Sequence, residues 1–346
     1  MKISRNPADF SLDVENEITT IDSHTAGEST RLILGGVGPV PGGTMAEKLD
    51  YFKTRLDSVR LMLTREPRGH SGVLAALVTE STTEDGDFGL IYMDARRYPY
   101  LCGHATIGAV ATLARTGDLE MDDGDNTIKI DTPSGRMEAK AFCRDGKVQS
   151  VAIQMVPSFV LETNRIIEVP GFGDVPIDLV CTGGFFAMVS SKETGIDLVP
   201  ENAGKLAELG MAIIEAANHQ VSVHHPLRPE VTTVDVAEFY DPDRHSHMEG
   251  KNVVVYGESH IDRSPCGTGT AAKLTLMHHH GEIGINQTLT NFSPLGTSFE
   301  GKIVETTAIG DFTGIVAEIK GNAQITGVHR FMVDSDDPFP QGFILP

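Results

Sequence analysis

The chain has 346 residues, of which 40% are hydrophobic and 22% charged, so it is long enough for two globular units with their own cores. Its 28 basic and 48 acidic residues give a net charge of −20, which argues against a nucleic acid or an anionic membrane as partner. No apolar run approaches the roughly 18–20 residues of a membrane-spanning helix, and the first residues lack the apolar core of a signal peptide. Four cysteines are too few for a disulfide scaffold, so we expect a cytoplasmic protein.

The first part of the chain, up to about residue 157, combines short strands with helical stretches. Apolar residues at helical spacing predict one helix from 44 to 63. A second helix is expected between Cys102 and Gly117, because the run between them has no breaker and ends at a glycine. Strands are predicted at 17–22, 30–34, 73–79, 88–93, 127–131, 136–142 and 148–156.

The second part, from about residue 158, also combines short strands with helical stretches. Helices are predicted at 200–218 and between Cys266 and Gly281. Strands are predicted at 158–161, 166–169, 177–181, 185–189, 232–240 and 252–256, with further short strands to about 333. Mixed short strands with few long helices indicate an α+β fold. No low-complexity linker separates the parts, so we expect two lobes packed together: 13–157, joined by the tail 330–346, and 158–329.

Two stretches of the chain match each other in detail. Cys102-Gly103-His104-Ala105-Thr106 and Cys266-Gly267-Thr268-Gly269-Thr270 both follow the pattern Cys-Gly-x-x-Thr. A strand-like run precedes each, a helix-stopping glycine follows fifteen residues after each cysteine, and a Pro-x-Gly turn lies further downstream. This repetition indicates a duplicated unit of strand, loop, cysteine, helix and hairpin.

The position of these two cysteines predicts chemistry. A thiol at the first turn of a helix meets unpaired N–H groups and the positive end of the helix dipole, so we expect a lowered pKa and a good base or nucleophile. One activated cysteine would suggest a covalent nucleophile. Two equivalent thiols that face each other suggest two-base proton transfer at a carbon acid. The alternative is that both are core cysteines; Cys143 and Cys181 lack this context, and we expect them to be buried without a catalytic role.

Four stretches resemble the proline racemase family. They are Asp22-Ser23-His24-Thr25-Ala26-Gly27-Glu28, Glu66-Pro67-Arg68-Gly69-His70, Cys102 to Gly108, and Asp262-Arg263-Ser264-Pro265-Cys266-Gly267-Thr268-Gly269-Thr270. The family includes proline racemases, hydroxyproline 2-epimerases and trans-3-hydroxyproline dehydratases, and the resemblance extends from about residue 17 to the C-terminus. It implies an isomerase that needs neither a cofactor nor a metal. It also implies a diaminopimelate-epimerase-like fold, in which two pseudo-symmetric lobes each wrap a mixed sheet or barrel around a central helix.

The resemblance also assigns roles to residues. It implies that Cys102 and Cys266 are the two bases and that Asp262 holds the substrate amine. The substrate carboxylate would lie between the two cysteine loops, on Gly103 and His104 from one and Gly267 and Thr268 from the other. The family's dehydratases carry threonine at the second cysteine position, so the cysteine found here favours a racemase or epimerase.

Some positions depart from the family pattern and leave the substrate open. Leu74 stands where proline racemases carry an aromatic side chain, Leu101 replaces a frequent methionine, and Arg96-Arg97-Tyr98-Pro99-Tyr100 is unusual. We expect racemisation of proline, with 4-hydroxyproline 2-epimerisation as the alternative; a dehydratase or a non-catalytic binder of cyclic amino acids ranks behind them. The resemblance suggests a homodimer. His278-His279-His280 closes the second cysteine helix and is not expected to hold a metal.

Overall fold

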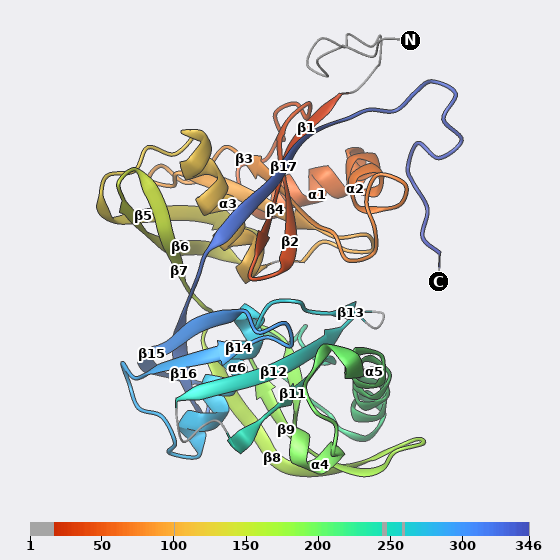
Figure 1. The fold of residues 1–346 in the computed structure, drawn as a ribbon, viewed down its shortest axis with the longest axis vertical. Helices are drawn as coiled ribbons and strands as arrows, with labels where there is room; N and C mark the ends of the chain where they lie inside the picture. The colour runs from red at the N-terminus through yellow and green to blue at the C-terminus, as the bar shows by residue number, and fades with distance from the viewer. Residues whose placement is uncertain (1–16, 100, 244–247, 258–259, 346) are drawn as a thin grey trace.

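The computed structural model describes residues 17–99, 101–243, 248–257 and 260–345. Figure 1 shows two lobes, one above the other along the longest axis, with the chain crossing between them twice on one side. The upper lobe holds the first seven strands and β17, and the lower lobe holds β8 to β16. The α+β fold with two lobes is confirmed. The N-terminal lead-in and Tyr100 lie outside the described residues.

The upper lobe is built mainly from the first half of the chain. Its elements are β1 (Ile18–Thr25), β2 (Glu28–Gly35), α1 (Met45–Arg55), α2 (Asp57–Thr64), β3 (Leu74–Thr79), β4 (Phe88–Met93), α3 (Gly103–Thr116), β5 (Gly124–Thr132), β6 (Gly135–Arg144), β7 (Lys147–Gln154) and β17 (Ala323–Phe331). Strand β17 pairs with β1 along its whole length, so the chain returns to this lobe after β16.

The lower lobe contains the remaining elements. They are β8 (Ser158–Val169), β9 (Gly173–Cys181), β10 (Phe185–Ser190), α4 (Ser191–Thr194), η2 (Pro200–Asn202), α5 (Ala203–Gln220), β11 (Val234–Tyr240), β12 (Glu249–Tyr256), β13 (His260–Ile261), α6 (Gly267–His279), β14 (Thr288–Phe292), β15 (Ser298–Ile309) and β16 (Phe312–Gly321). No helix among the described residues is long and apolar enough to cross a membrane.

The order of strand pairing repeats between the lobes. In the upper lobe the order is β17-β1-β2-β3-β4-β5-β6-β7, with parallel pairs only at β2–β3 and β4–β5. In the lower lobe it is β8-β9-β10-β11-β12-β14-β15-β16, with parallel pairs only at β10–β11 and β12–β14. Pairing of β16 with β8 closes the second set into a barrel. The duplicated unit in the sequence is therefore a repeated lobe.

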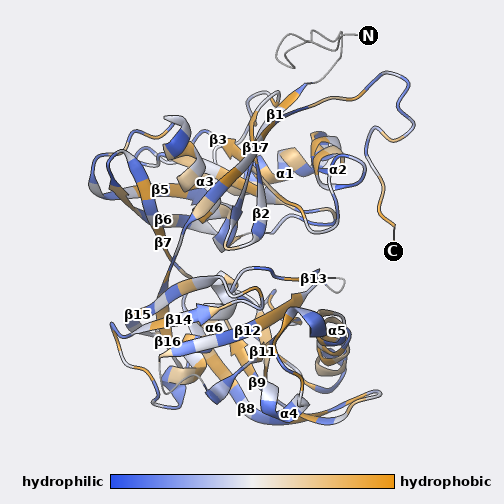
Figure 2. Ribbon diagram, in the orientation of Figure 1, coloured by the Kyte–Doolittle hydropathy of each residue, from blue (hydrophilic) through white to orange (hydrophobic). Residues whose placement is uncertain are grey.

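Each lobe surrounds one central helix. Helix α3 is buried at every position from Gly103 to Leu113, and α6 is buried at Gly267 and from Gly269 to Met277. Both helices consist largely of glycine, alanine and threonine in their first turns, so strands pack close around them. The strands and buried helices of both lobes carry much of the hydrophobic colouring in Figure 2. Gly117 ends α3 in the left-handed conformation (φ 85°), as its position in the sequence predicted.

Two predicted boundaries differ from the structure. The helix predicted from 44 to 63 is two helices, because the chain bends at Leu56 (φ −128°, ψ 14°). Leu49 and Phe52 of α1 and Leu63 of α2 belong to the same hydrophobic cluster on either side of the bend. The strands predicted at 158–161 and 166–169 are one strand, β8, because register shifts on either side of Glu162 let pairing with β9 continue.

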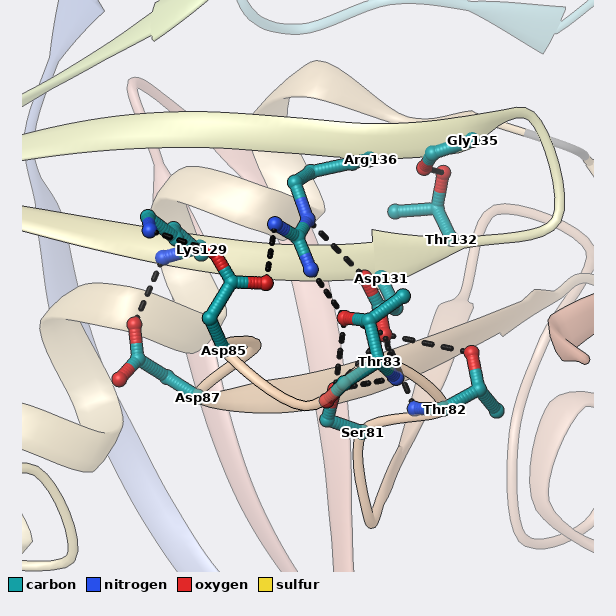
Figure 3. Close-up of polar contacts among 10 residues, drawn as sticks. All are labelled: Ser81, Thr82, Thr83, Asp85, Asp87, Lys129, Asp131, Thr132, Gly135 and Arg136. Atoms are coloured by element: carbon teal, nitrogen blue, oxygen red, sulfur yellow. Dashed lines mark hydrogen bonds and ion pairs between the residues drawn. The ribbon is translucent and has the colours of Figure 1, made fainter.

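One buried carboxylate fixes the loop between β3 and β4 on the β5–β6 hairpin (Figure 3). Asp131 Oδ2 accepts five hydrogen bonds of 2.7–3.2 Å from the backbone and hydroxyl groups of Ser81, Thr82 and Thr83. Burial opposes its ionisation, but these donors outweigh burial and lower the pKa of Asp131 to about 2. Arg136 lies 3.4 Å from Oδ1 and also pairs with Asp85.

Replacing Asp131 with alanine is expected to lower the free energy of unfolding by roughly 2–3 kcal/mol, because several donors lose a buried, charged acceptor. Urea unfolding followed by circular dichroism measures the change. Exposed Asp125 on the same hairpin is the control, and D125A should leave stability within about 0.5 kcal/mol. Since the pKa is lowered from 3.8 to about 2, the contribution is complete above pH ~4 and disappears as the pH falls through ~2. A gap between wild type and D131A that stays constant down to pH 2 would contradict this role.

Candidate active site

The two central helices begin against each other at the junction of the lobes. Cys102 is the N-cap residue of α3, and Cys266 is the N-cap residue of α6, as the sequence predicted. A Cβ atom added to Gly103 would lie 3.7 Å from the Cα atom of Gly267, so the two backbones approach with nothing between them. The positive ends of both helices therefore meet at one place.

A cavity of about 140 Å³ lies where these helices meet. Every residue that the sequence assigned to the site lines it: Cys102, Gly103, His104, Asp262, Cys266, Gly267 and Thr268. The rest of its wall is largely apolar and includes Leu74, Phe186, Val236 and Val254. Such a cavity combines a few polar groups at one end with a surface for a small apolar ring.

Cys266 occupies a strained turn. Its backbone has a φ of 59° and a ψ of 124°, a conformation that residues other than glycine rarely adopt. Such strained residues are frequent at functional sites. The Gly269 N–H donates to Sγ at 3.3 Å, and Thr268 Oγ1 lies 3.3 Å from the same sulfur. The N–H of Cys266 donates to Ser264 Oγ at 3.1 Å. These contacts hold the thiol at the start of α6.

The expected low pKa at Cys266 is wrong. Burial, followed by the negative charge of Asp262, raises the pKa of the Cys266 thiol well above its usual value. Hydrogen bonds from Thr268 and from the Gly269 N–H act in the opposite direction but are outweighed. The position at a helix start was predicted, whereas the removal of the thiol from water and the adjacent carboxylate depend on tertiary structure.

Cys102 has a different partner. Its Sγ lies 3.4 Å from Nδ1 and 3.7 Å from Nε2 of His104, two residues further into α3. Burial alone would favour the neutral imidazole, but Cys102, Glu28 and Asp262 raise the pKa of His104 to about 10. His104 is therefore positively charged at neutral pH. The two cysteines thus share a motif but not an electrostatic environment.

Asp262 lies on the lower lobe between the cysteine loop and the cavity. It is 3% exposed, and its Oδ1 accepts hydrogen bonds from the N–H (2.8 Å) and Oγ (2.7 Å) of Ser264. Burial and the charge of Glu28 raise its pKa, while His104 opposes that change. A cationic substrate amine would favour the charged carboxylate at this place.

Sequence reasoning missed a contact across the lobes. Glu28, at the start of β2, is 1% exposed and accepts a hydrogen bond of 2.7 Å from the backbone N–H of Arg263. Its other oxygen lies 3.2 Å from His260 Nε2 and 3.8 Å from the Arg263 guanidinium. Burial resists ionisation, but His260, His104 and Arg263 keep the pKa of Glu28 below its usual value. The available signal was the position of Glu28 at the end of the Asp22–Glu28 motif, to which no role had been given.

Other chemically active residues have structural partners. His24 Nδ1 accepts the Gly27 N–H at 3.2 Å, and His70 Nδ1 accepts the Gly72 N–H at 3.1 Å. Cys143 and Cys181 are buried, as expected. His278 Nδ1 lies 3.0 Å from the carbonyl oxygen of Ile283. Across the part of the chain that the structure describes, no group of three or more histidine, cysteine, aspartate or glutamate residues could hold a metal ion.

A larger cavity, of about 410 Å³, lies on the other side of Asp262 between the start of α5 and β13. It contains neither cysteine, so its size does not make it the reaction site. The unusual stretch before Cys102 borders the smaller cavity through Arg97 and Pro99, and Leu74 and Asp94 also line this cavity. The departures from the family pattern therefore lie where a substrate would be selected.

Comparison with known proteins agrees with this site. The family described as proline racemase matches residues 20–344. The chain is 39% identical to the proline racemase of Clostridioides difficile over 328 residues, covering 95% of this chain and 98% of the relative. It is 38% identical to the 4-hydroxyproline 2-epimerase of Streptosporangium roseum, covering 94% and 97%. A crystal structure of a hydroxyproline epimerase from Agrobacterium vitis with bound trans-4-hydroxy-L-proline aligns with a TM-score of 0.85 at 29% identity, covering 96% of each chain.

The fold and these relatives define the class of the protein: it is an isomerase that acts on amino acids as a racemase or epimerase. More narrowly, the chain belongs to the proline racemase family.

Replacing Glu28 with glutamine is expected to shift the titration midpoint of His104 to lower pH, because a negative charge that favours the imidazolium is removed. NMR titration of the histidine ring resonances measures this midpoint, and assignment uses the H104N variant. The control is E17Q, which removes a half-buried carboxylate that is paired with Arg330, outside the cavity. An unchanged His104 midpoint in E28Q would show that the Glu28 charge does not act on His104.

Proposed function

We propose that the protein racemises proline at Cα without a cofactor, with Cys102 and Cys266 as the two acid–base groups. One observation carries the proposal: both thiols belong to one small cavity and stand at the starts of two helices that meet there. A planar carbanion needs a base on one face and an acid on the other. The equivalent cysteine loops of the two lobes supply such a pair.

The substrate would lie with its carboxylate at the two helix starts. The residues Gly103 and His104 face it from α3, and Gly267 and Thr268 face it from α6. Backbone N–H groups and the charged His104 stabilise the carboxylate as it gains negative charge during loss of the Cα proton. Asp262 holds the ring ammonium group, and the apolar wall holds the ring carbons.

The proton transfers balance without any co-reactant. A thiolate takes the Cα proton from one face, which breaks the C–H bond and leaves its electron pair on Cα, delocalised into the carboxylate. The opposite thiol then delivers its proton to the other face and becomes a thiolate. The enzyme ends with the protonation of its two cysteines exchanged, ready for the reverse direction. The pair therefore titrates as one coupled system.

The resting enzyme is expected to be asymmetric. The positive His104 lies beside Cys102, whereas burial and Asp262 favour the neutral thiol of Cys266. This makes Cys266 the acid in the more populated form. The opposite form arises after each turnover and must return to the first.

The alternative substrate is 4-hydroxyproline, with inversion at C2. It is favoured by Asp94 and Arg97 on the cavity wall, which offer polar partners for a ring hydroxyl group, and by the relative that bears this activity in its name. A trans-3-hydroxyproline dehydratase is less favoured because Cys266 stands where dehydratases of the family carry threonine. A binding protein without catalysis would leave the paired thiols without a use.

We further propose that the protein is a cytoplasmic homodimer. Its binding partner is a small amino-acid substrate, and it binds neither a nucleic acid nor a membrane. The net charge of −20 and the family resemblance support this. Size-exclusion chromatography with light scattering tests the dimer, and a monomer at micromolar concentration would contradict it.

Replacing either Cys102 or Cys266 with serine is expected to reduce racemisation by at least about 100-fold, since a serine hydroxyl is a far weaker base and acid than a thiol. Polarimetry with L- and D-proline measures the rate in both directions. Buried Cys143, replaced by serine or alanine, is the matched control and should retain activity. Substantial racemisation by either single variant would rule out two-base catalysis by this pair.

Cα-proton exchange in D₂O, followed by NMR, separates the candidate substrates. L-proline, D-proline, trans-4-hydroxy-L-proline and cis-4-hydroxy-D-proline are compared in parallel. Exchange with inversion on proline is the expected result; inversion of the hydroxylated pair alone identifies the epimerase instead. A ring-unsaturated product from trans-3-hydroxyproline would identify a dehydratase, and binding without exchange would contradict all three reactions.

A further inference from the structure

A second carboxyl group is buried beneath the cysteine loop of α6, and the proposed reaction does not use it. Glu238, on β11, has 0% exposure. Its Oε1 accepts a hydrogen bond of 2.8 Å from Asn252 Nδ2. Its Oε2 is buried and has no hydrogen-bond partner among the described residues. An unpaired charged oxygen in this place would be costly, so the arrangement favours a protonated carboxyl group.

This group lies close to Cys266. A Cβ atom added to Gly269 would lie 2.8 Å from Glu238 Oε2 and 3.1 Å from Cys266 Cβ. The glycine is therefore required because the carboxyl oxygen and the cysteine approach the same point of the first helical turn. The same turn supplies the Gly269 N–H that donates to Cys266 Sγ.

Glu238 is also connected to the strained loop through hydrogen bonds. Asn252 Nδ2, which donates to Glu238, also donates to the carbonyl oxygen of Pro265 at 3.0 Å. Asn291 Nδ2 lies 3.3 Å from that carbonyl oxygen, and its Oδ1 accepts from Lys273 Nζ at 3.0 Å. The peptide immediately before Cys266 is thus held from two sides by buried amides.

The charges around Glu238 come from three elements. Lys273 lies on α6, Asp262 and Cys266 lie before and at the start of α6, and Asp241 beyond β11 acts on Lys273. Burial raises the pKa of Glu238 to about 8, against the opposing effects of Lys273 and Asn252. Burial also lowers the pKa of Lys273 to about 8, with Glu238 and Asp241 opposing. At neutral pH the carboxyl group is therefore mainly uncharged.

We propose that Glu238 is a positioning residue for Cys266, whose uncharged carboxyl group anchors the Pro265–Cys266 turn through Asn252 and keeps negative charge away from the thiol. The proposal rests on the proposed two-base function for its catalytic consequence. Ionisation of Glu238 places a carboxylate beside Cys266 and disfavours the thiolate. Glu238 would then contribute to the alkaline limit of activity by acting on Cys266 alone.

The test compares E238Q with wild type, because glutamine keeps the acceptor for Asn252 and cannot ionise. The rate of iodoacetamide alkylation of Cys266 is followed from pH 6 to 10 by peptide mass spectrometry, which needs no substrate. E238Q is expected to react about three- to tenfold faster than wild type at pH 9, since no carboxylate opposes the thiolate. In parallel, the alkaline limb of kcat/KM should change unequally in the two directions of racemisation, because Cys266 is the base in one direction and the acid in the other.

Two variants separate electrostatics from structure. E238L removes both the ionisable group and the anchor, so it should change the alkaline limb as E238Q does and, unlike E238Q, also lower activity across the whole pH range. E305Q, which removes an exposed carboxylate on β15, should match wild type. Superimposable alkylation profiles for E238Q and wild type would overturn the proposal. If the wild type shows no racemase activity but E238Q is alkylated faster than wild type as expected, the proposed function is rejected and the role of Glu238 is retained.

A measurement on the unaltered protein covers the case in which E238Q does not fold. Carbon NMR of protein labelled at the glutamate δ-carbon should show one side chain that remains protonated at pH 7 and titrates near pH 8. Ionisation of every glutamate below neutral pH would overturn the proposal independently of any variant.

Discussion

The close approach of two helix starts is the constraint on which the rest of the structure depends. Gly103 and Gly267 bring the backbones of α3 and α6 into van der Waals contact, since a Cβ atom at either position would lie 3.7 Å from the Cα atom of the other. Each helix is buried on nearly every side, and its small residues let eight strands of the lobe surround it. The repeated strand order then has a physical purpose, since it presents two equivalent helix ends to one cavity.

Equivalent backbones nevertheless produce unequal thiols. The residue two positions after each cysteine is histidine in α3 and threonine in α6, and each lies within 3.5 Å of its sulfur. A charged imidazolium favours negative charge on one side, whereas Asp262 and burial oppose it on the other. The proposed two-base reaction needs one base and one acid at the same time, and an inequality of this kind would select its starting form. It comes from the side chains around the motif, because the motif itself is the same in both lobes.

The sequence predicted the repeat, the α+β class and both helix starts, because each depends on local patterns such as Cys-Gly followed by an unbroken run to a glycine. The seven residues assigned through the family resemblance also line one cavity. The bend at Leu56 was missed because the helical spacing of apolar residues continues unbroken from α1 into α2. Glu28 and His260 are 232 positions apart, and no local pattern relates them. The pKa of Cys266 was predicted in the wrong direction because burial cannot be read from a helix start.

The same long-range contacts relate closure of the lobes to the charge in the site. Strands β7 and β16 pair across the junction at one edge, and the chain crosses there twice (Figure 1). Glu28 binds His260 and Arg263 at a different part of the junction, through contacts that are all non-covalent. Because Asp262 of the lower lobe helps to keep His104 of the upper lobe charged, separating the lobes would weaken the imidazolium beside Cys102. The positive charge of His104 is thus favoured most when the two lobes are together, because Asp262 reaches it only across the junction.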